Sequence, residues 1–246
     1  MSKLKFMNIE VDNLTMSEAI NAMDLLIQNK ENAYVVTPNV DHIVQLEKDS
    51  EFRKCYDEAS LVLTDGKPLI WISKLYKKPI KEKISGSDVF PQLCGLAEKK
   101  GYKIFFLGAA EGVAQKAAEN IKVKYPDIRI VGTYSPEYGF EKDEEKVKKV
   151  VGIVKETNPD ILIVALGAPK QEKFIYNNRN ELEVPLSLGL GATLDFEAGN
   201  VKRAPVWMSA HGLEWLYRIF QEPKRMFKRY FVDFIKICLL YTSPSP

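Results

Sequence analysis

The chain has 246 residues, of which 46% are hydrophobic, and its 35 basic side chains nearly balance its 33 acidic ones. This composition argues against a disordered, a collagen-like or a coiled-coil protein, and the length fits one large α/β domain, alone or with an appendage. The three cysteines are widely spaced and form no Cys-x-x-Cys pair. They therefore indicate free thiols in a reducing compartment, and they argue against a disulfide framework or a zinc knuckle. Because the N-terminus is interrupted by charges and no run of about 18 apolar residues is present, we expect a cytoplasmic protein.

The first 200 residues alternate short apolar stretches with stretches of helical periodicity. Strands are predicted at Lys5–Val11, Ala33–Val36, Leu61–Leu63, Lys103–Leu107, Ile128–Thr133, Ile161–Leu166 and Pro185–Leu188. Helices are predicted between them, over 16–27, Val40–Glu47, 51–58, Glu111–Lys124, Glu144–Glu156 and Gln171–Arg179. Strands and helices that alternate at this spacing predict an α/β fold, with a Rossmann-like, mostly parallel sheet covered by helices on both faces.

Several predicted helices begin at recognisable capping residues. Thr15 and Glu18 have the spacing of a capping box. Asn39 and Ser50 are expected to cap the next two helices through their side-chain oxygens. Pro68 falls in the first turn of a further helix, where its missing N–H costs little.

The charge of the chain is unevenly distributed, which divides it into three parts. Residues 201–236 contain eight basic and three acidic side chains, so they carry +5 while the rest of the chain carries −3. We expect an α/β domain over residues 1–200 and a helical, basic amphipathic appendage over 201–236. Residues 237–246 contain no charge and do not continue the helical pattern, and we interpret them as a non-native or disordered tail.

The appendage has the pattern of a membrane-surface helix. On a helical wheel of residues 224–236, the basic side chains fall within one arc and the aromatic ones on roughly the opposite side. Such a helix suits an anionic membrane, where each basic residue contributes about 1 kcal/mol. The predicted membrane contacts are Lys224, Lys228 and Arg229. An ordinary amphipathic helix packed on the domain is the alternative, and nucleic acid is a lesser one, because the remaining surface is acidic.

Polar and glycine-rich clusters follow five of the predicted strands. They are Thr37-Pro-Asn39, Thr64-Asp-Gly66, Leu107-Gly-Ala-Ala-Glu-Gly112, Leu166-Gly-Ala-Pro-Lys-Gln-Glu172 and the segment 188–199. In open parallel sheets, ligands bind beyond the carboxyl ends of the strands. We therefore expect these clusters to contribute to one site.

Two of the clusters have the form of a phosphate-binding turn. Gly108 and Gly167 each lie between a strand and a helix, so that backbone N–H groups can face a phosphate at the helix N-terminus. Neither cluster is a Gly-x-Gly-x-x-Gly motif or a P-loop, and a tight strand–helix turn is the alternative for Gly108. In the second cluster, Lys170 or Gln171 could reach a pyrophosphate or a sugar hydroxyl. Alternatively, Pro169 is a first-turn proline, and Lys170 and Glu172 are solvated.

A carboxylate at the end of a buried strand is a candidate general base. Asp65 follows Leu61–Leu63 and precedes Gly66, and it could take a proton from a sugar hydroxyl or simply cap the next helix. The chain contains no Asp-x-Asp, the pair that holds a divalent ion in many sugar-nucleotide transferases, so we predict no metal site. His42 and His211 are interpreted as structural residues.

In combination, these clusters and several further motifs resemble the WecG/TagA/CpsF glycosyltransferases over about residues 8–230. The resemblance rests on the clusters at 37–39, 64–66 and 166–172 and on Ser85-Gly-Ser-Asp88, 189–199, Arg203-Ala-Pro205, Gly212-Leu-Glu-Trp215 and Glu222-Pro-Lys-Arg225. It implies transfer of N-acetylmannosamine from UDP to the 4-hydroxyl of undecaprenyl-diphosphate-linked N-acetylglucosamine, which forms a β-1,4 disaccharide of the wall teichoic acid linkage unit. It also implies an inverting, metal-independent enzyme without a cofactor, peripheral on the inner face of the cell membrane and with no nucleic-acid partner. A homodimer is the assembly that the family suggests.

The resemblance assigns roles to individual residues. Asp65 matches the family's proposed base. The family's donor-pocket residues match Thr37, Asn39 and Gln171, and the turn residues Gly108, Gly167 and Gly191 complete the predicted donor-binding set. The predicted diphosphate or acceptor contacts are Lys83, Arg203, Arg218 and Arg225. The family often has Arg where Lys83 stands, and a lysine supplies charge without a bidentate fork.

The sequence leaves open two other function classes and the identity of the donor sugar. A dinucleotide-dependent oxidoreductase is disfavoured by the missing Gly-x-Gly-x-x-Gly. A non-catalytic, membrane-bound scaffold that binds nucleotide-sugars would bind UDP without turnover. N-acetylmannosamine, its uronic acid and a hexose would share the same diphosphate contacts, so the donor could be any UDP-sugar of surface polysaccharide synthesis.

Overall fold

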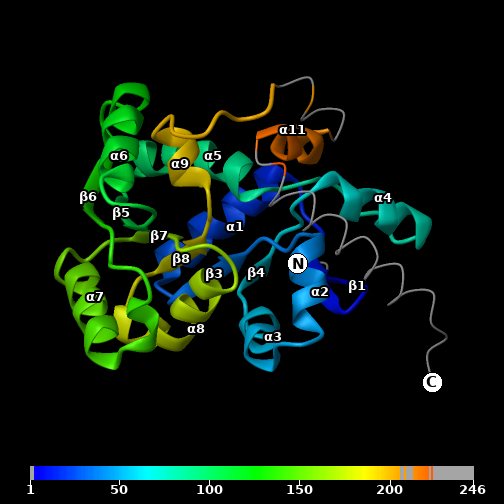
Figure 1. The fold of residues 1–246 in the computed structure, drawn as a ribbon, viewed down its shortest axis with the longest axis horizontal. Coiled ribbons are helices and arrows are strands. Elements are labelled where there is room, and N and C mark those ends of the chain that lie inside the picture. Colours follow the sequence, from blue (N-terminus) through cyan, green and yellow to red (C-terminus); the bar gives the residue numbers. More distant parts are fainter. Residues whose placement is uncertain (1–2, 206–207, 209–212, 222, 224–246) are drawn as a thin grey trace.

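The computed structural model describes residues 3–205, 208, 213–221 and 223 of the chain. Their centre is a six-stranded parallel sheet with the strand order β4-β3-β8-β7-β5-β6, which confirms the predicted α/β class (Figure 1). The strands are β3 (Ala33–Val36), β4 (Leu61–Val62), β5 (Lys103–Gly108), β6 (Arg129–Tyr134), β7 (Ile161–Ala165) and β8 (Leu186–Gly189).

Helices cover both faces of this sheet, as the alternating sequence pattern predicts (Figure 1). One face packs against α1 (Met16–Asn29), α5 (Gly86–Lys100), α6 (Val113–Lys124) and α9 (Thr193–Glu197). The other packs against α2 (Val40–Leu46), α3 (Ser50–Asp57), α4 (Lys67–Leu75), α7 (Glu144–Glu156) and α8 (Lys170–Leu182). Successive residues of each strand point to opposite faces, so Val35 joins the first core and Tyr34 the second.

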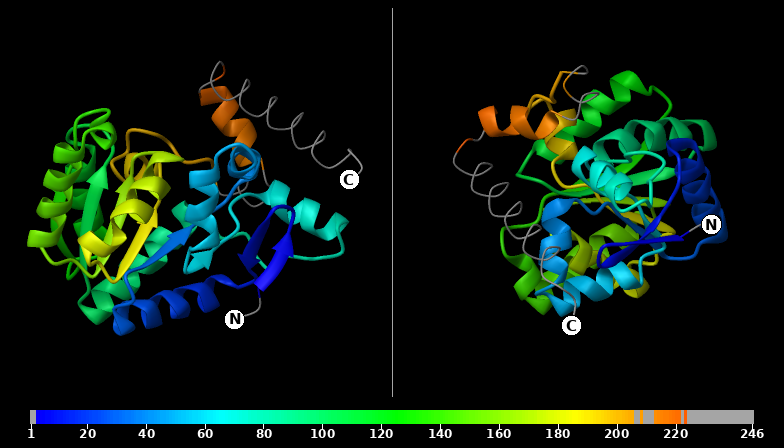
Figure 2. Two further views of the ribbon diagram at one scale, coloured as in Figure 1. Left: turned by 90° about the horizontal axis from the view of Figure 1, so that it is seen from below. Right: turned by 90° about the vertical axis from the view of Figure 1, so that its right-hand side faces the viewer.

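The N-terminal stretch differs from the prediction of one strand. It forms an antiparallel hairpin of β1 (Lys3–Phe6) and β2 (Ile9–Asp12), which lies beside α4 (Figure 2). The reversal occurs at Met7, whose φ of 54° is the left-handed conformation that a tight turn uses. Asp12 then links the hairpin to the sheet, because its Oδ2 accepts a hydrogen bond from the backbone N–H of Val62 at 2.9 Å.

The predicted helix caps are confirmed with one correction. Thr15 and Glu18 form the complete capping box of α1, and Asn39 accepts from the backbone N–H of His42. The cap of α3 is Asp49 and not Ser50, because the Asp49 carboxylate accepts from the backbone N–H of Phe52 at 2.9 Å. Pro68 lies in the first turn of α4 as expected.

The 15-residue helix α5 is absent from the prediction, although its N-terminus becomes part of the site. The helix begins at Ser85-Gly-Ser, with Ser85 as its N-cap, and its interior contains Pro91. Both the Ser-Gly pair and the proline are typical of loops. Tertiary packing overrides these local preferences, because Val89, Phe90 and Leu93 are almost completely buried against the sheet.

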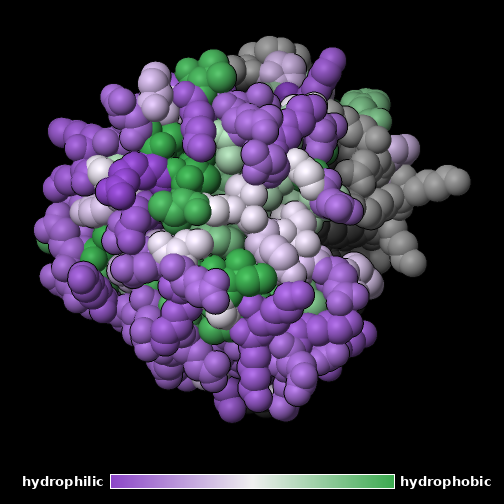
Figure 3. Space-filling model, turned by 90° about the vertical axis from the view of Figure 1, so that its left-hand side faces the viewer, coloured by the Kyte–Doolittle hydropathy of each residue, from purple (hydrophilic) through white to green (hydrophobic). Residues whose placement is uncertain are grey.

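Two faces of the molecule lie away from the carboxyl ends of the strands. The face beyond the β6 edge is predominantly hydrophilic over α6 and α7 (Figure 3). At the opposite side of the molecule, α4 projects away from the sheet (Figures 1 and 2). None of the helices in the described residues is long and apolar enough to cross a membrane. Cys55 and Cys94 are buried free thiols.

Gly108 is required by the close approach of β5 to β7. A Cβ at this position would lie 2.6 Å from the backbone oxygen of Ala165, and φ is +103°. Gly112 has a similar φ of +76°, but a Cβ there would meet nothing within 4 Å. Gly108→Ala is therefore expected to lower the free energy of unfolding by about 2 kcal/mol or more, because overpacking adds to backbone strain.

Gly112→Ala is the matched control, since it carries only the backbone strain of about 1 kcal/mol. Urea denaturation of both variants checks the comparison. Equal losses in the two variants would contradict the packing role of Gly108.

Candidate active site

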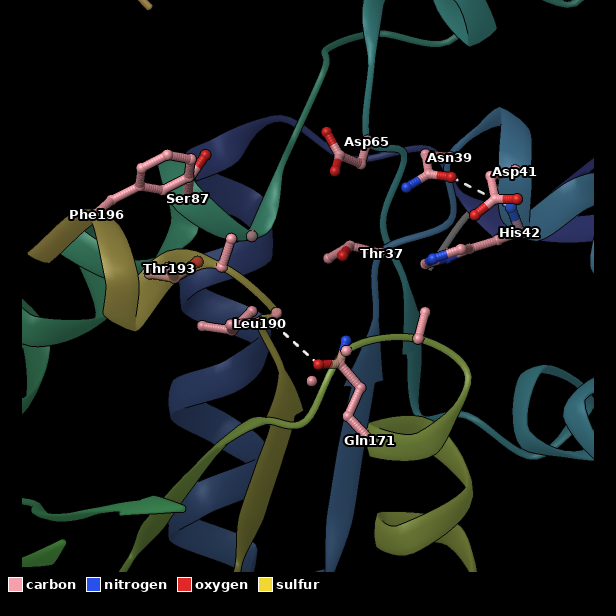
Figure 4. A pocket seen from close by; sticks show the side chains of 16 residues that line it. Thr37, Asn39, Asp41, His42, Asp65, Ser87, Gln171, Leu190, Thr193 and Phe196 are labelled. Atoms are coloured by element: carbon pink, nitrogen blue, oxygen red, sulfur yellow. Dashed lines mark hydrogen bonds between the residues drawn. The ribbon is translucent and has the colours of Figure 1, made fainter. Parts of the chain in front are cut away.

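A pocket of about 410 Å³ lies at the carboxyl ends of four neighbouring strands. Residues that follow β3, β4, β7 and β8 line it, together with the first turn of α5 and the segment that includes α9 (Figure 4). The lining residues are Thr37, Asn39, Asp41, His42, Asp65, Gly86, Ser87, Gly167, Ala168, Gln171, Gly189, Leu190, Gly191, Ala192, Thr193 and Phe196. The pocket thus has the position in which open parallel sheets bind ligands.

The strand order explains which predicted residues meet. Thr37, Asn39, Asp65, Gly167, Gln171 and Gly191 all line the pocket. Their four parent strands are adjacent in the order β4-β3-β8-β7. Gly108 ends β5, which lies beyond β7, and it is not among the lining residues.

Asp65 stands at the edge of the pocket where β4 gives way to α4. Its backbone N–H donates to the carbonyl of Pro38 at 2.9 Å, which fixes the turn to the end of β3. Gly66 then adopts φ +100° as the N-cap of α4, a conformation open to glycine. In Figure 4 the Asp65 carboxylate points into the same space as the Asn39 amide. The geometry suits a carboxylate that approaches a bound hydroxyl.

Asn39 and His42 connect the end of β3 to a buried polar cluster. The Asn39 Oδ1 caps α2, so its amide nitrogen faces the pocket (Figure 4). His42 Nδ1 lies 2.7 Å from the Tyr56 hydroxyl, and the imidazole is 6% exposed. The histidine therefore has the structural role that the sequence suggests, and it also lines the pocket wall.

Gln171 ties two walls of the pocket together. Its Oε1 accepts from the backbone N–H of Gly191 at 2.9 Å, and its Nε2 donates to Glu172 Oε1 at 2.8 Å. The side chain packs so closely on β8 that a Cβ on Gly189 would lie 2.9 Å from Gln171 Cγ. These contacts leave Gln171 one orientation, with its amide plane at the floor of the pocket (Figure 4).

Glu172 is a buried carboxyl group beneath this floor. It is 1% exposed, and its Oε2 has no hydrogen-bond partner in the described residues. Burial disfavours the charged form and raises the pKa of Glu172 to about 7, although the hydrogen bond from Gln171 opposes that rise. The alternative in which Glu172 is solvated is therefore wrong, because the side chain of this first-turn glutamate packs beneath the pocket floor.

Helix N-termini supply positive potential to the pocket. Gly86 and Ser87 open the 15-residue helix α5, and Gly167 and Ala168 precede the 13-residue helix α8. The N-terminus of a helix carries roughly half a positive charge and unpaired N–H groups. No lysine or arginine occurs among the described residues that line the pocket. An anionic ligand would therefore meet backbone dipoles first.

The predicted cations Lys83 and Arg203 lie next to the pocket and converge on Asp88. Lys83 Nζ is 2.7 Å from Asp88 Oδ2, and Arg203 forms an ion pair with Oδ1. Arg203 also donates to the backbone oxygen of the pocket residue Ser87 at 3.3 Å. Burial would raise the pKa of Asp88, but hydrogen bonds from Lys83 and Ser85 and the charges of Lys83 and Arg203 hold it below its usual value.

The remaining predicted residues lie outside the pocket or outside the described residues. Lys170 pairs with Glu141 at 2.6 Å and lies over the Tyr138 ring, while Pro169 is the N-cap of α8. Arg218 belongs to α11 (Glu214–Gln221), and its side chain is not described. Lys224, Arg225, Lys228 and Arg229 lie outside the described residues, as do His211, Cys238 and the tail 237–246.

Several lining residues lie in segments that the sequence analysis describes but were not predicted as individual site residues. Ser87 comes from the helix that was not predicted, and its motif alone gave a signal. Asp41 follows the Asn39 cap and adds a second carboxylate to the lining. Phe196 is the one aromatic ring among the described lining residues other than His42, and it faces the Asp65 side from across the cavity (Figure 4). The part of the chain that the structure describes contains no group of three or more His, Cys, Asp or Glu side chains placed to hold a metal ion.

Comparison with known proteins identifies the family. The model of the glycosyl transferase WecG/TagA/CpsF family matches residues 4–244. A curated N-acetylglucosaminyldiphosphoundecaprenol N-acetyl-beta-D-mannosaminyltransferase from Bacillus subtilis strain 168 is 38% identical over 199 residues, which are 81% of this chain and 75% of that protein. The protein of the same name from Bacillus spizizenii strain W23 is 36% identical over 81% of this chain and 75% of its own length. The one from Staphylococcus aureus strain MW2 is 27% identical over 92% of this chain and 87% of its own length. The chain therefore belongs to the WecG/TagA/CpsF family of glycosyl transferases.

Proposed function

We propose that this protein transfers N-acetylmannosamine from UDP-N-acetylmannosamine to the 4-hydroxyl of N-acetylglucosaminyl-diphosphoundecaprenol. The product is the β-1,4 disaccharide of the wall teichoic acid linkage unit. The relatives named above carry the name of this transferase. The observation that carries the proposal is the pocket, where Asp65, Asn39, Thr37 and Gln171 surround one cavity at the carboxyl ends of the strands.

Asp65 acts as the general base in this proposal. It removes the proton of the acceptor 4-hydroxyl, whose oxygen attacks the anomeric carbon from the face opposite the leaving UDP. The C–O bond to the diphosphate breaks as the new glycosidic bond forms, so the anomeric configuration inverts. The position of Asp65 on the pocket edge supports this role, because an acceptor can enter from the side of α4 while the donor fills the interior.

The leaving diphosphate is stabilised by backbone N–H groups and by the cations beside the pocket. The first turn of α5 faces the cavity through Ser87, and the N-terminus of α8 faces it through the preceding residue Gly167. Lys83 and Arg203 supply further positive charge. Both pair with Asp88, which follows the pocket residue Ser87 in the chain. Arg218 and Arg225 of the appendage are proposed to add further positive charge for the same leaving group. In this proposal Gly108 does not contact the donor, and its role is to allow the close approach of β5 to β7.

A panel of donors tests the assignment. Release of UDP is measured with UDP-N-acetylmannosamine, UDP-N-acetylglucosamine and the uronic acid of the first sugar, each with and without lipid-linked acceptor and in the presence of EDTA. The proposal predicts acceptor-dependent release with UDP-N-acetylmannosamine, at least about tenfold faster than with its C2 epimer, because a misplaced 2-acetamido group leaves buried polar groups unpaired. Binding of UDP without turnover for every donor would instead support the non-catalytic scaffold.

A further inference from the structure

Helix α4 presents an apolar surface that the fold leaves uncovered. Leu69, Ile70 and Ser73 face the core and are at most 9% exposed. On the opposite side of the helix, Trp71 is 51% exposed and Leu75 is 82% exposed. The two side chains are four residues apart and therefore adjacent on the helix surface. Isolated exposed apolar residues are ordinary, whereas adjacent ones form a patch, and apolar patches with a polar rim are typical of protein and membrane contacts.

Lysines surround this apolar pair. Lys67 and Lys74 flank it on the helix, and Lys77 and Lys78 follow directly after the C-terminus. The described residues place no carboxylate within ion-pair distance of these four lysines. Lys78 is oriented by a hydrogen bond from its Nζ to the backbone oxygen of Lys5 at 3.1 Å, which ties the basic cluster to the β1–β2 hairpin.

The combination identifies the kind of partner. A tryptophan and a leucine between lysines, on the exposed side of an amphipathic helix, match the groups found at the boundary between lipid headgroups and acyl chains. A second copy of this chain is disfavoured, because a twofold contact through α4 would bring the two lysine clusters together. We infer that α4, through Trp71, Leu75 and the surrounding lysines, docks this protein on an anionic lipid surface, independently of the C-terminal appendage.

The position of α4 gives this contact a consequence for the site. The helix begins directly after Asp65 and Gly66, so its nine residues span roughly 13 Å from the pocket edge to the exposed tip. A bilayer at the tip of α4 would hold a lipid-linked diphosphate within reach of the Asp65 side of the pocket. This consequence rests on the proposed function, but the docking itself does not.

Trp71 provides a direct test in the full chain. The three tryptophans are Trp71, Trp207 and Trp215, so the double variant Trp207→Phe, Trp215→Phe reports on α4 alone. With vesicles of phosphatidylglycerol and phosphatidylcholine, we expect its emission to shift to the blue and to be quenched by lipids brominated near the headgroup end of the acyl chains. Co-sedimentation of the protein without quenching of Trp71 would overturn the inference, because the contact would then lie elsewhere.

A second, matched pair of variants does not depend on fluorescence. Leu75→Glu is expected to weaken co-sedimentation with the anionic vesicles by at least about tenfold. Val123→Glu is the control, since Val123 is also 82% exposed but lies on α6 at the other end of the sheet. Equal binding by the two variants would contradict the inference. A change in oligomeric state of Leu75→Glu without lipid, seen by sedimentation equilibrium, would assign α4 to a contact between copies and would also overturn it.

A soluble acceptor separates this inference from the proposed function. Transfer to a short-chain, water-soluble lipid-diphosphate acceptor is expected to be the same in the wild type, Leu75→Glu and Val123→Glu. Absence of transfer in all three, with normal vesicle binding by the wild type, would count against the proposed function and leave the docking of α4 supported.

Discussion

Asp65→Asn is expected to lower the rate of sugar transfer by about 10²–10⁴-fold while the fold and UDP binding stay intact. The amide keeps the shape of the side chain but cannot accept the proton of the acceptor hydroxyl, and a general base contributes an effect of this size. Single-turnover kinetics, with the enzyme in excess over the acceptor and the donor saturating, measures the chemical step directly. The melting temperature and the dissociation constant for UDP serve as the checks on folding and donor binding.

Asp41→Asn is the matched control for this variant. Asp41 is the other carboxylate that lines the pocket, and it belongs to the first turn of α2. We expect it to retain turnover within about tenfold, because it is not at the edge where the acceptor enters. Loss of turnover in Asp41→Asn with normal turnover in Asp65→Asn would transfer the role of base to Asp41.

The second large effect concerns stability and arises from Glu172. Its pKa rises from 4.5 in the unfolded chain to about 7 in the folded protein, because burial disfavours the carboxylate. The folded state therefore prefers the protonated acid. The stabilisation of the folded state by protonated Glu172 is fully present below pH 4.5. It is lost progressively as the pH rises through about 7, and it is absent above that pH.

Glu172→Gln is expected to remove this pH dependence. The difference in the free energy of unfolding between pH 5 and pH 8 should shrink in the variant by up to about 3 kcal/mol, relative to the wild type. Urea denaturation at a series of pH values measures this difference. Glu156→Gln, which changes an exposed carboxylate at the end of α7, should leave the pH profile unchanged. An unaltered profile in Glu172→Gln would show that Glu172 is ionised throughout this range.

The contacts of Glu172 connect this effect to the pocket. Its Oε1 holds the Gln171 amide, which in turn holds the backbone of Gly191. A change in the charge of Glu172 therefore acts on the orientation of a proposed donor-binding side chain. It does so without direct contact between Glu172 and the cavity, since Glu172 is not among the lining residues.

Local sequence patterns predict most elements of this fold because they depend on few residues. The apolar runs at β5 and β7 and the caps at Thr15 and Asn39 are confirmed. The prediction fails where long-range contacts decide the outcome. Pro91 and the Ser-Gly-Ser start argue against α5, yet burial on the sheet forms that helix. The reversal at Met7 is equally invisible, because methionine rarely adopts a positive φ.

The composition of the site depends on the order of strands in the sheet, which local patterns do not specify. Five strand-end clusters are visible in the sequence, and the clusters after β3, β4, β7 and β8 meet in one pocket. The Gly108 cluster follows β5, one strand further along, and a sequence alone gives no reason to separate it from the Gly167 cluster. The contact of Arg203 with Asp88 likewise joins residues that are 115 positions apart in the chain.

The product of the reaction tests the central claim most directly. The wild-type protein is incubated with UDP-N-acetylmannosamine and a lipid-linked N-acetylglucosamine diphosphate, and the lipid is analysed by mass spectrometry and by NMR of its sugar protons. We predict a lipid heavier by one N-acetylhexosamine, joined through a β-1,4 bond to the acceptor sugar. An unchanged lipid, or a retained α configuration at the new bond, would contradict the inverting transfer in which Asp65 activates the acceptor hydroxyl.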